Sequence, residues 1–180
     1  MFKLISFLLF LPCFFLFTLD SLAYQYRLEE INFKNETISL TLNDSSVWET
    51  SSKNLEEIQK FQKSDLVIIT ANNSWFQSEY PLRVINPRTE SSINIKNLFC
   101  PLIDNLSARF LANLDLKRNI LTLNDNLSFS VNPKDFSLYQ TWQEGDFILI
   151  GRNSELLTIY TYSDILINLS TNSYVRAAPF

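Results

Sequence analysis

Short runs of alternating apolar and polar residues occupy most of the chain after residue 23. The runs 38–42 (Ile-Ser-Leu-Thr-Leu) and 121–123 (Leu-Thr-Leu) alternate with period two, which is typical of a strand with one buried face. The first run is followed by Asn, Asp and Ser residues and the second by Asn and Asp residues, whose short side chains bond the local backbone and favour turns. Since a second short β-prone run follows each turn, at 47–50 and 127–131, the pattern predicts two hairpins.

A different pattern follows each hairpin. Segments 51–61 and 132–142 begin with Ser or Asn and carry apolar residues every third position, which predicts a capped, short helix or 3₁₀ turn. A tight turn then leads into a third strand at 66–70 or 147–150, and the nearly continuous apolar character of this strand predicts burial on both faces. Gly145 fits a positive φ in the second turn, a conformation that Ser64 has to tolerate or avoid in the first.

The second half of the chain repeats the first. A shift of 81 residues aligns the pentapeptide Leu-Thr-Leu-Asn-Asp at 40–44 with the identical one at 121–125, and it gives ten identities in the 32 positions of 39–70 against 120–151. One inserted residue then moves the shift to 82 up to the C-terminus. Because the apolar and turn positions match best, we expect the halves to share one fold of about five short strands and one helical turn.

The order of these elements resembles that of SH3-like barrels, and it is similar to tandem repeats of uncharacterised secreted bacterial proteins. Segment 142–146 (Trp-Gln-Glu-Gly-Asp) carries the characteristic turn in full, whereas 61–65 (Phe-Gln-Lys-Ser-Asp) differs in the aromatic residue and the glycine. The resemblance covers both halves and implies a fold rather than an activity. The expected fold class is all-β with short helical turns, arranged as two tandem five-stranded SH3-like barrels from an internal duplication, each with its own apolar core.

The N-terminus has the features of a secretory signal. Residues 1–23 combine an early lysine, a long apolar run and a small-x-small ending at Ser21 and Ala23, so cleavage is expected after Ala23 and the protein is expected to be exported to the periplasm or the cell exterior. The alternative is an uncleaved signal anchor that tethers the protein to the membrane. With cleavage, no stable membrane span remains.

The remaining chain divides into a first barrel at 24–97, a linker at 98–106 and a second barrel at 107–180. The linker contains a proline and turn-forming residues, and a short helix is expected from Asn105 through Leu111.

Composition excludes several chemistries. The 180 residues include no histidine and only two glycines, so neither an imidazole-based catalytic triad nor a glycine-rich phosphate loop exists in the chain. The formal net charge of −4 argues against binding to nucleic acid or to anionic membranes. We therefore expect no cofactor and no nucleic acid partner.

The most suggestive acidic residues are Asp65 and Asp146, which recur at the same position before the third strand. An aspartate after a tight turn usually accepts hydrogen bonds from backbone amides, so we assign Asp65, Asp146 and Gly145 to structural turns. The alternative is a carboxylate-dependent hydrolase that uses Asp65 or Asp146.

The turns 43–44 and 124–125 supply the oxygen ligands that calcium prefers, but the 12-residue calcium-binding loop is missing. We expect no metal site there.

Aromatic residues give the best binding candidates. The loop after the third strand contains Trp75 and Phe76, followed by Tyr80, where the second half has the pair Leu156 and Leu157. Because loops on a rigid frame commonly carry binding residues, Trp75, Phe76 and Tyr80 are candidate ligand-binding residues; the alternative is that they pack between the two barrels.

The expected function is an exported, non-catalytic binding or structural module of the bacterial envelope, whose partner is a protein or another envelope component. A small outer-membrane β-barrel is a further alternative, although most of the apolar runs are shorter than the ten residues such strands need.

Overall fold

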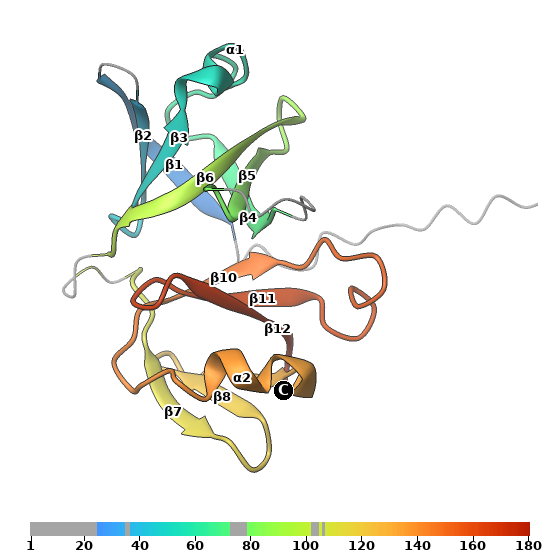
Figure 1. Cartoon of the computed structure of the whole chain (residues 1–180). Helices are drawn as coiled ribbons and strands as arrows, with labels where there is room; N and C mark the ends of the chain where they lie inside the picture. The colour runs from blue at the N-terminus through green and yellow to red at the C-terminus, as the bar shows by residue number, and fades with distance from the viewer. Residues whose placement is uncertain (1–24, 35–36, 73–78, 102–104, 106) are drawn as a thin grey trace, which may run out of the picture.

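Twelve strands and four short helical segments make up the described part of the chain, which comprises residues 25–34, 37–72, 79–101, 105 and 107–180 of the computed structural model (Figure 1). The first half contains β1 (Tyr26–Lys34), β2 (Thr37–Leu42), β3 (Val47–Ser51), η2 (Ser52–Asn54), α1 (Leu55–Ile58), β4 (Leu66–Ala71), β5 (Leu82–Asn86) and β6 (Ser91–Phe99). The second half contains β7 (Leu111–Asp115), β8 (Ile120–Leu123), β9 (Ser128–Val131), η3 (Pro133–Asp135), α2 (Phe136–Tyr139), β10 (Ile148–Arg152), β11 (Asp164–Asn168) and β12 (Ser173–Pro179).

The first six strands form a closed ring. They pair in the order β1-β2-β3-β6-β5-β4, and the start of β1 pairs with β4, Tyr26 opposite Val67. The second half repeats this order as β7-β8-β9-β12-β11-β10, and a bridge between Phe110 and Phe147 joins its two end strands. The expected all-β, barrel-like class with short helical turns is therefore confirmed.

Unusual backbone conformations also recur in the two halves. Positive φ angles occur at three pairs of positions that are separated by the sequence shift of 81 or 82 residues: Ser45 and Asn126, Ser64 and Gly145, and Glu90 and Asn172. Ser64 has a φ of 73° where Gly145 has 92°, so the first half adopts the left-handed conformation there without glycine.

Two expectations were wrong. Each half has six strands rather than five, because β1 and β7 precede the first predicted strands. In β1 only Tyr26 and Leu28 are buried, and the register shifts after Leu28, so no regular alternation marks this strand in the sequence. The helix expected from Asn105 through Leu111 is absent from the described residues of that segment, and Leu111 instead begins β7.

The apolar cores are not separate. Trp48, Phe61 and Trp142 are buried, but the cluster around Trp48 also contains Leu149, Ile165, Ile167 and Leu169 of the second half. These residues alternate with Ile148, Ile150 and Leu166, which belong to the second cluster. Strands β10 and β11 therefore bury one face in each cluster, and the expectation of an independent core in each half is corrected.

Close contacts fix this junction. Strands β4 and β10 pair in parallel where Thr70 lies opposite Arg152. The Tyr26 hydroxyl accepts a hydrogen bond from the Ile150 amide at 3.0 Å and donates one to the Ile150 carbonyl at 3.2 Å. Gly151 lies so near β4 that a Cβ would stand 2.6 Å from the Ile69 carbonyl oxygen. The two halves thus form one continuous packed unit.

Candidate functional site

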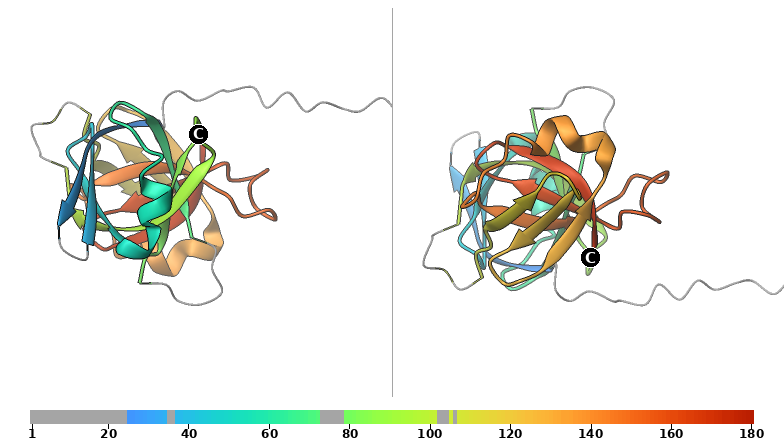
Figure 2. Two further views of the ribbon diagram at one scale, coloured as in Figure 1. Left: turned by 90° about the horizontal axis from the view of Figure 1, so that it is seen from above. Right: turned by 90° about the horizontal axis from the view of Figure 1, so that it is seen from below.

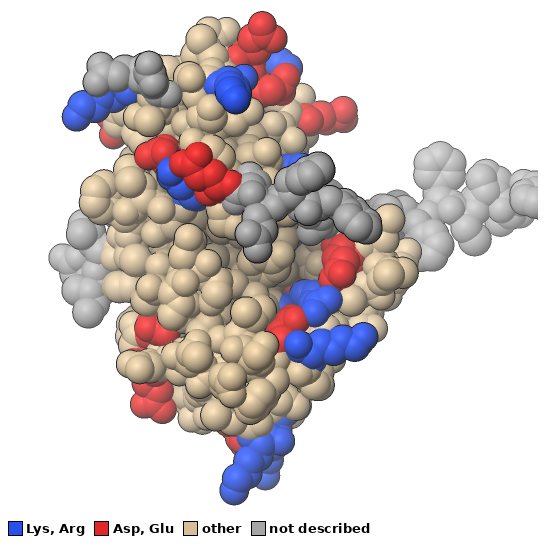
Figure 3. Space-filling view, in the orientation of Figure 1, with Lys and Arg blue, Asp and Glu red and all other residues tan. Residues whose placement is uncertain are grey.

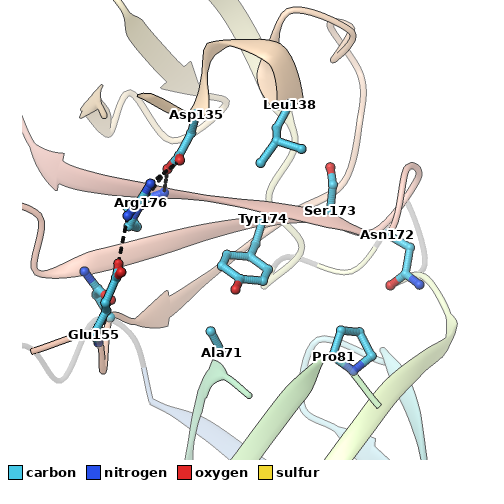
Figure 4. Close-up of a pocket in the computed structure, with 10 residues that line it drawn as sticks. Ala71, Pro81, Asp135, Leu138, Glu155, Asn172, Ser173, Tyr174 and Arg176 are labelled. Atoms are coloured by element: carbon cyan, nitrogen blue, oxygen red, sulfur yellow. Dashed lines mark hydrogen bonds and ion pairs between the residues drawn. The ribbon is translucent and has the colours of Figure 1, made fainter. Parts of the chain in front are cut away.

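A groove of about 490 Å³ opens where the two halves meet (Figure 4). Ala71 and Pro81, at the end of β4 and just before β5, form its first-half side. The second half supplies most of the wall: Asp135, Leu138, Asn153, Glu155, Asn172, Ser173, Tyr174 and Arg176. The groove therefore exists only because both halves pack together.

An ion-pair network forms one wall of the groove. The Arg176 guanidinium contacts Asp135 through two nitrogens, Nε at 2.9 Å and Nη2, and its Nη1 donates to Glu155 Oε2 at 2.8 Å. Hydrogen bonding to Asp135 and then Glu155 raises the pKa of Arg176, against the opposing effect of burial. The Thr158 hydroxyl and Arg176 lower the pKa of Glu155. Two carboxylates share one guanidinium, so this wall carries a net negative charge.

The helical turn before α2 places Asp135 against β12. Asn132 caps this turn by accepting a hydrogen bond from the Lys134 amide at 3.1 Å, while its own amide donates to the Arg176 carbonyl at 2.9 Å. The Arg176 amide in turn donates to Asp135 Oδ2 at 2.9 Å. Backbone and side-chain bonds hold the carboxylate in place, which preorganises this wall.

Apolar side chains lie beside the charged wall. Leu138 of α2 is 44% exposed, and Tyr174 of β12 points into the groove between Leu138 and the first-half residues Ala71 and Pro81 (Figure 4). Burial raises the pKa of the Tyr174 hydroxyl, which is therefore a neutral donor and acceptor near pH 7. A ligand with an apolar group and a cationic or hydrogen-bonding group matches this combination.

Asp65 and Asp146 make equivalent turn contacts. Each Oδ2 accepts a hydrogen bond from the amide three residues earlier, at 2.8 Å from Gln62 and 2.9 Å from Gln143. Each Oδ2 also accepts a hydrogen bond from an asparagine side chain: Asn86 donates to Asp65, and Asn168 donates to Asp146.

Only Asp65 pairs with a cation: Arg88 Nε lies 2.8 Å from its Oδ1 and lowers the pKa of Asp65 to about 2. Both aspartates are engaged with their own turns, and neither lines the groove between the halves.

The structure brings the turns 43–44 and 124–125 together around a second cavity of about 270 Å³. Arg109 lies between them and pairs with Asp125 at 2.7 Å, whereas Asp44 accepts from the amide and hydroxyl of Ser46. Burial raises the pKa of Asp44. In the described ranges no cluster of three or more carboxylate, cysteine or histidine side chains has the geometry of a metal site.

Trp75 and Phe76 lie outside the described residues. Tyr80 is half-buried, and the Lys96 ammonium lies 5.2 Å from the centroid of its ring. Lys96 also pairs with Glu79 at 2.6 Å and Glu49 at 3.0 Å. The Tyr80 ring thus lies within a cluster of charges on the first half.

The residues of the groove were missed by sequence reasoning. Asp135 and Arg176 are 41 residues apart, and neither belongs to a chemically recognisable pattern. The only local signal is the Asn-Pro start of the helical turn, which predicts the turn but not the partner of its aspartate.

Comparisons of the chain with protein-family models, curated protein sequences and solved structures gave no match. Within the part of the chain that the structure describes, no helix has the length and apolar character needed to cross a bilayer. The groove itself is thus the main basis for a functional assignment.

Proposed function

We propose that the chain is an exported, non-catalytic binding module of the bacterial envelope, in which the groove between the halves takes an extended polypeptide segment. The observation that carries this proposal is the groove itself, which combines exposed Leu138 and half-buried Tyr174 with the charged side chains of Asp135, Glu155 and Arg176. A polypeptide offers apolar side chains, cationic side chains and backbone hydrogen-bonding groups along one line, which this combination suits.

The surface around the groove supports binding to a protein rather than to a polyanion. In the space-filling view most of this face is neither basic nor acidic, and the blue and red atoms lie close to each other (Figure 3). Such a mixed surface lacks the continuous basic area that nucleic acid binding needs.

The proposal is tested by site-specific photocrosslinking in the intact envelope of the native host. A photoreactive phenylalanine analogue replaces Leu138 in the groove or, as a matched control, Leu55 of α1, which is 43% exposed and lies outside the groove. A discrete protein adduct from position 138 and none from position 55 is the expected result. Equal adducts at both positions, or none at either, would contradict a groove-specific polypeptide ligand.

A charge variant tests the same site independently. Leu138→Glu replaces the exposed apolar side chain of the groove with a carboxylate, which an apolar group of the ligand would have to desolvate, so the adduct from a probe at Tyr174 should decrease several-fold. Leu55→Glu should leave that adduct unchanged. A loss of adduct in both variants would indicate altered folding rather than groove binding.

A further inference from the structure

The loop between β10 and β11 presents the most exposed apolar side chains among the described residues. Leu156, Leu157 and Tyr160 are 84%, 92% and 93% exposed. Residues 156–163 (Leu-Leu-Thr-Ile-Tyr-Thr-Tyr-Ser) contain no charged side chain. Exposed apolar residues are common singly, but three of them on one uncharged projection mark an interaction surface.

The base of this loop is held by a hydrogen-bonded network. Asn153 is 2% exposed; its side-chain amide donates to the Thr158 hydroxyl at 2.9 Å and to the Tyr162 carbonyl at 2.7 Å, and its oxygen accepts from the Glu155 amide at 3.0 Å. Glu155 is in turn paired with Arg176. These contacts hold the tip away from the body (Figure 2), so little conformational entropy would be lost on binding.

The loop leaves the protein at a definite end. Because β4 and β10 are parallel, with Thr70 opposite Arg152, both strands run toward the same end, and the chain after each strand emerges there. The Thr70 hydroxyl lies 2.9 Å from the Ser154 hydroxyl at this point. We call this the loop end of the molecule.

The N-terminal apolar segment joins the molecule at the loop end as well. Strand β1 is antiparallel to β4, with Tyr26 opposite Val67 and Arg27 opposite Leu66, so β1 begins on the side toward which β4 runs. The apolar run from Leu4 to Leu19 is therefore connected to this end by only six residues, 20–25. Six residues span at most about 21 Å, so a membrane that holds the apolar run would lie on the loop-end side of the molecule.

We propose that the β10–β11 loop is a membrane-contacting loop, whose Leu156, Leu157 and Tyr160 side chains enter the interface of the bilayer that receives the N-terminal segment. Leucine side chains favour the acyl region and tyrosine the headgroup level, and no charge between 156 and 163 opposes insertion. Exposed Arg152 at the base of the loop would lie at headgroup depth. This inference rests on the alternative in which the N-terminal signal stays uncleaved as a membrane anchor, and it does not depend on the groove ligand.

The test measures the depth of the loop in a bilayer. The full chain, with Cys13→Ser and Cys100→Ser, carries a single spin-labelled cysteine in place of Leu157 and is reconstituted into vesicles of phosphatidylcholine and phosphatidylethanolamine. Zwitterionic lipids are used because the protein is acidic. The matched control is Phe33→Cys, which replaces a 59% exposed apolar residue near the opposite end of β1.

The label at 157 should be several-fold more accessible to oxygen, and several-fold less accessible to a water-soluble nickel complex, than the label at 33. Equal accessibility at both positions would overturn the proposal. Protection of position 157 without vesicles would also overturn it, because a second copy or another protein would then be covering the loop.

A second variant separates insertion driven by the loop from simple proximity. Leu156→Ser/Tyr160→Ser, with the label kept at 157, should return the label to the aqueous accessibility of position 33. The thermal unfolding midpoint should stay the same, because both replaced side chains are more than 80% exposed. A label that remains in lipid in this variant would show that these side chains do not drive the contact, and the proposal would fail.

Discussion

The turns before β4 and β10 have the same backbone but different charges. Asp65 and Asp146 accept equivalent hydrogen bonds, yet the first turn adds Arg88 where the second has Ser170. The reverse holds on the helical side of the barrels, where the ion pair of Asp135 with Arg176 in the second half has no charged counterpart in the first. The shared hydrogen bonds thus define the fold, and the unshared ion pairs are where the halves differ chemically.

The burial of the equivalent strands β4 and β10 shows a second difference. In β10 every residue but Arg152 is buried, whereas β4 leaves Leu66 and Ile68 half-buried. Gly151 lies where the shift of 81 places Thr70, and only the glycine is compatible with the close approach of the Ile69 carbonyl. Strand β10 of the second half is therefore suited to close packing on both faces, whereas β4 of the first half retains some contact with solvent.

The largest effect is expected from Gly151→Ala. The added Cβ would stand 2.6 Å from the Ile69 carbonyl oxygen and 2.9 Å from Ile165 Cγ1, so β4 and β10 must separate. We expect a loss of about 3 kcal/mol in the free energy of unfolding, measured by chemical denaturation. Gly145→Ala is the control, because its Cβ meets nothing within 4 Å, and only its φ of 92° costs about 1 kcal/mol. Equal losses would disprove the tight junction.

Tyr26→Phe should have the next largest effect. It removes the hydroxyl that pairs with both the amide and the carbonyl of Ile150, and Ile150 is fully buried. Leaving these groups without partners should cost about 2 kcal/mol in the free energy of unfolding. The control is Tyr160→Phe, which removes the hydroxyl of a residue that is 93% exposed. It should change the free energy of unfolding by less than about 0.5 kcal/mol. A similar result for both variants would mean that water replaces the Tyr26 hydroxyl at the junction.

The ion pair of the first turn predicts a pH-dependent difference between the halves. The pKa of Asp65 is lowered from 3.8 to about 2, so the stabilisation from its charge is complete above pH 4 and is lost as the pH falls toward 2. Asp65→Asn should therefore cost about 1 to 2 kcal/mol near neutral pH, allowing for the half-exposed Arg88, and progressively less in acid.

Asp146→Asn is the matched variant in the second turn. It weakens hydrogen bonds from neutral donors only, so we expect a loss of about 1 kcal/mol in the free energy of unfolding. Denaturation at pH 7 and pH 3 compares the two. A loss for Asp65→Asn that does not shrink between these pH values would contradict the role of Arg88.

Much of the fold could be predicted from the sequence because its signals are local. The hairpins and helical turns follow from alternation, turn residues and caps within a few positions, and the apolar run at 147–150 predicts the burial of β10 on both faces. Strand β1 could not be predicted in this way, because residues 29–34 are polar or exposed apart from half-buried Ile31, and its pairing with β2 and β4 explains it.

The site was less predictable than the fold. The groove needs the packing of one half on the other, which no pattern within either half specifies. The apolar pair Leu156 and Leu157 was visible in the sequence, but its near-complete exposure depends on the network at Asn153. A run of apolar residues predicts burial by default, and only the structure shows where a base of hydrogen bonds overrides that expectation.

The smallest effect concerns the backbone conformation that the two halves share. Ser64 has a φ of 73° where the second half uses glycine, so Ser64→Gly should stabilise the protein by about 0.5 kcal/mol in chemical denaturation. Ser45 has a similar φ of 68°, but its hydroxyl accepts a hydrogen bond from the Asn105 side chain at 2.8 Å. Ser45→Gly relieves the same backbone conformation but loses that hydrogen bond, so it should give no net increase in the free energy of unfolding. If Ser45→Gly stabilised the protein as much as Ser64→Gly, the contact with Asn105 would contribute nothing.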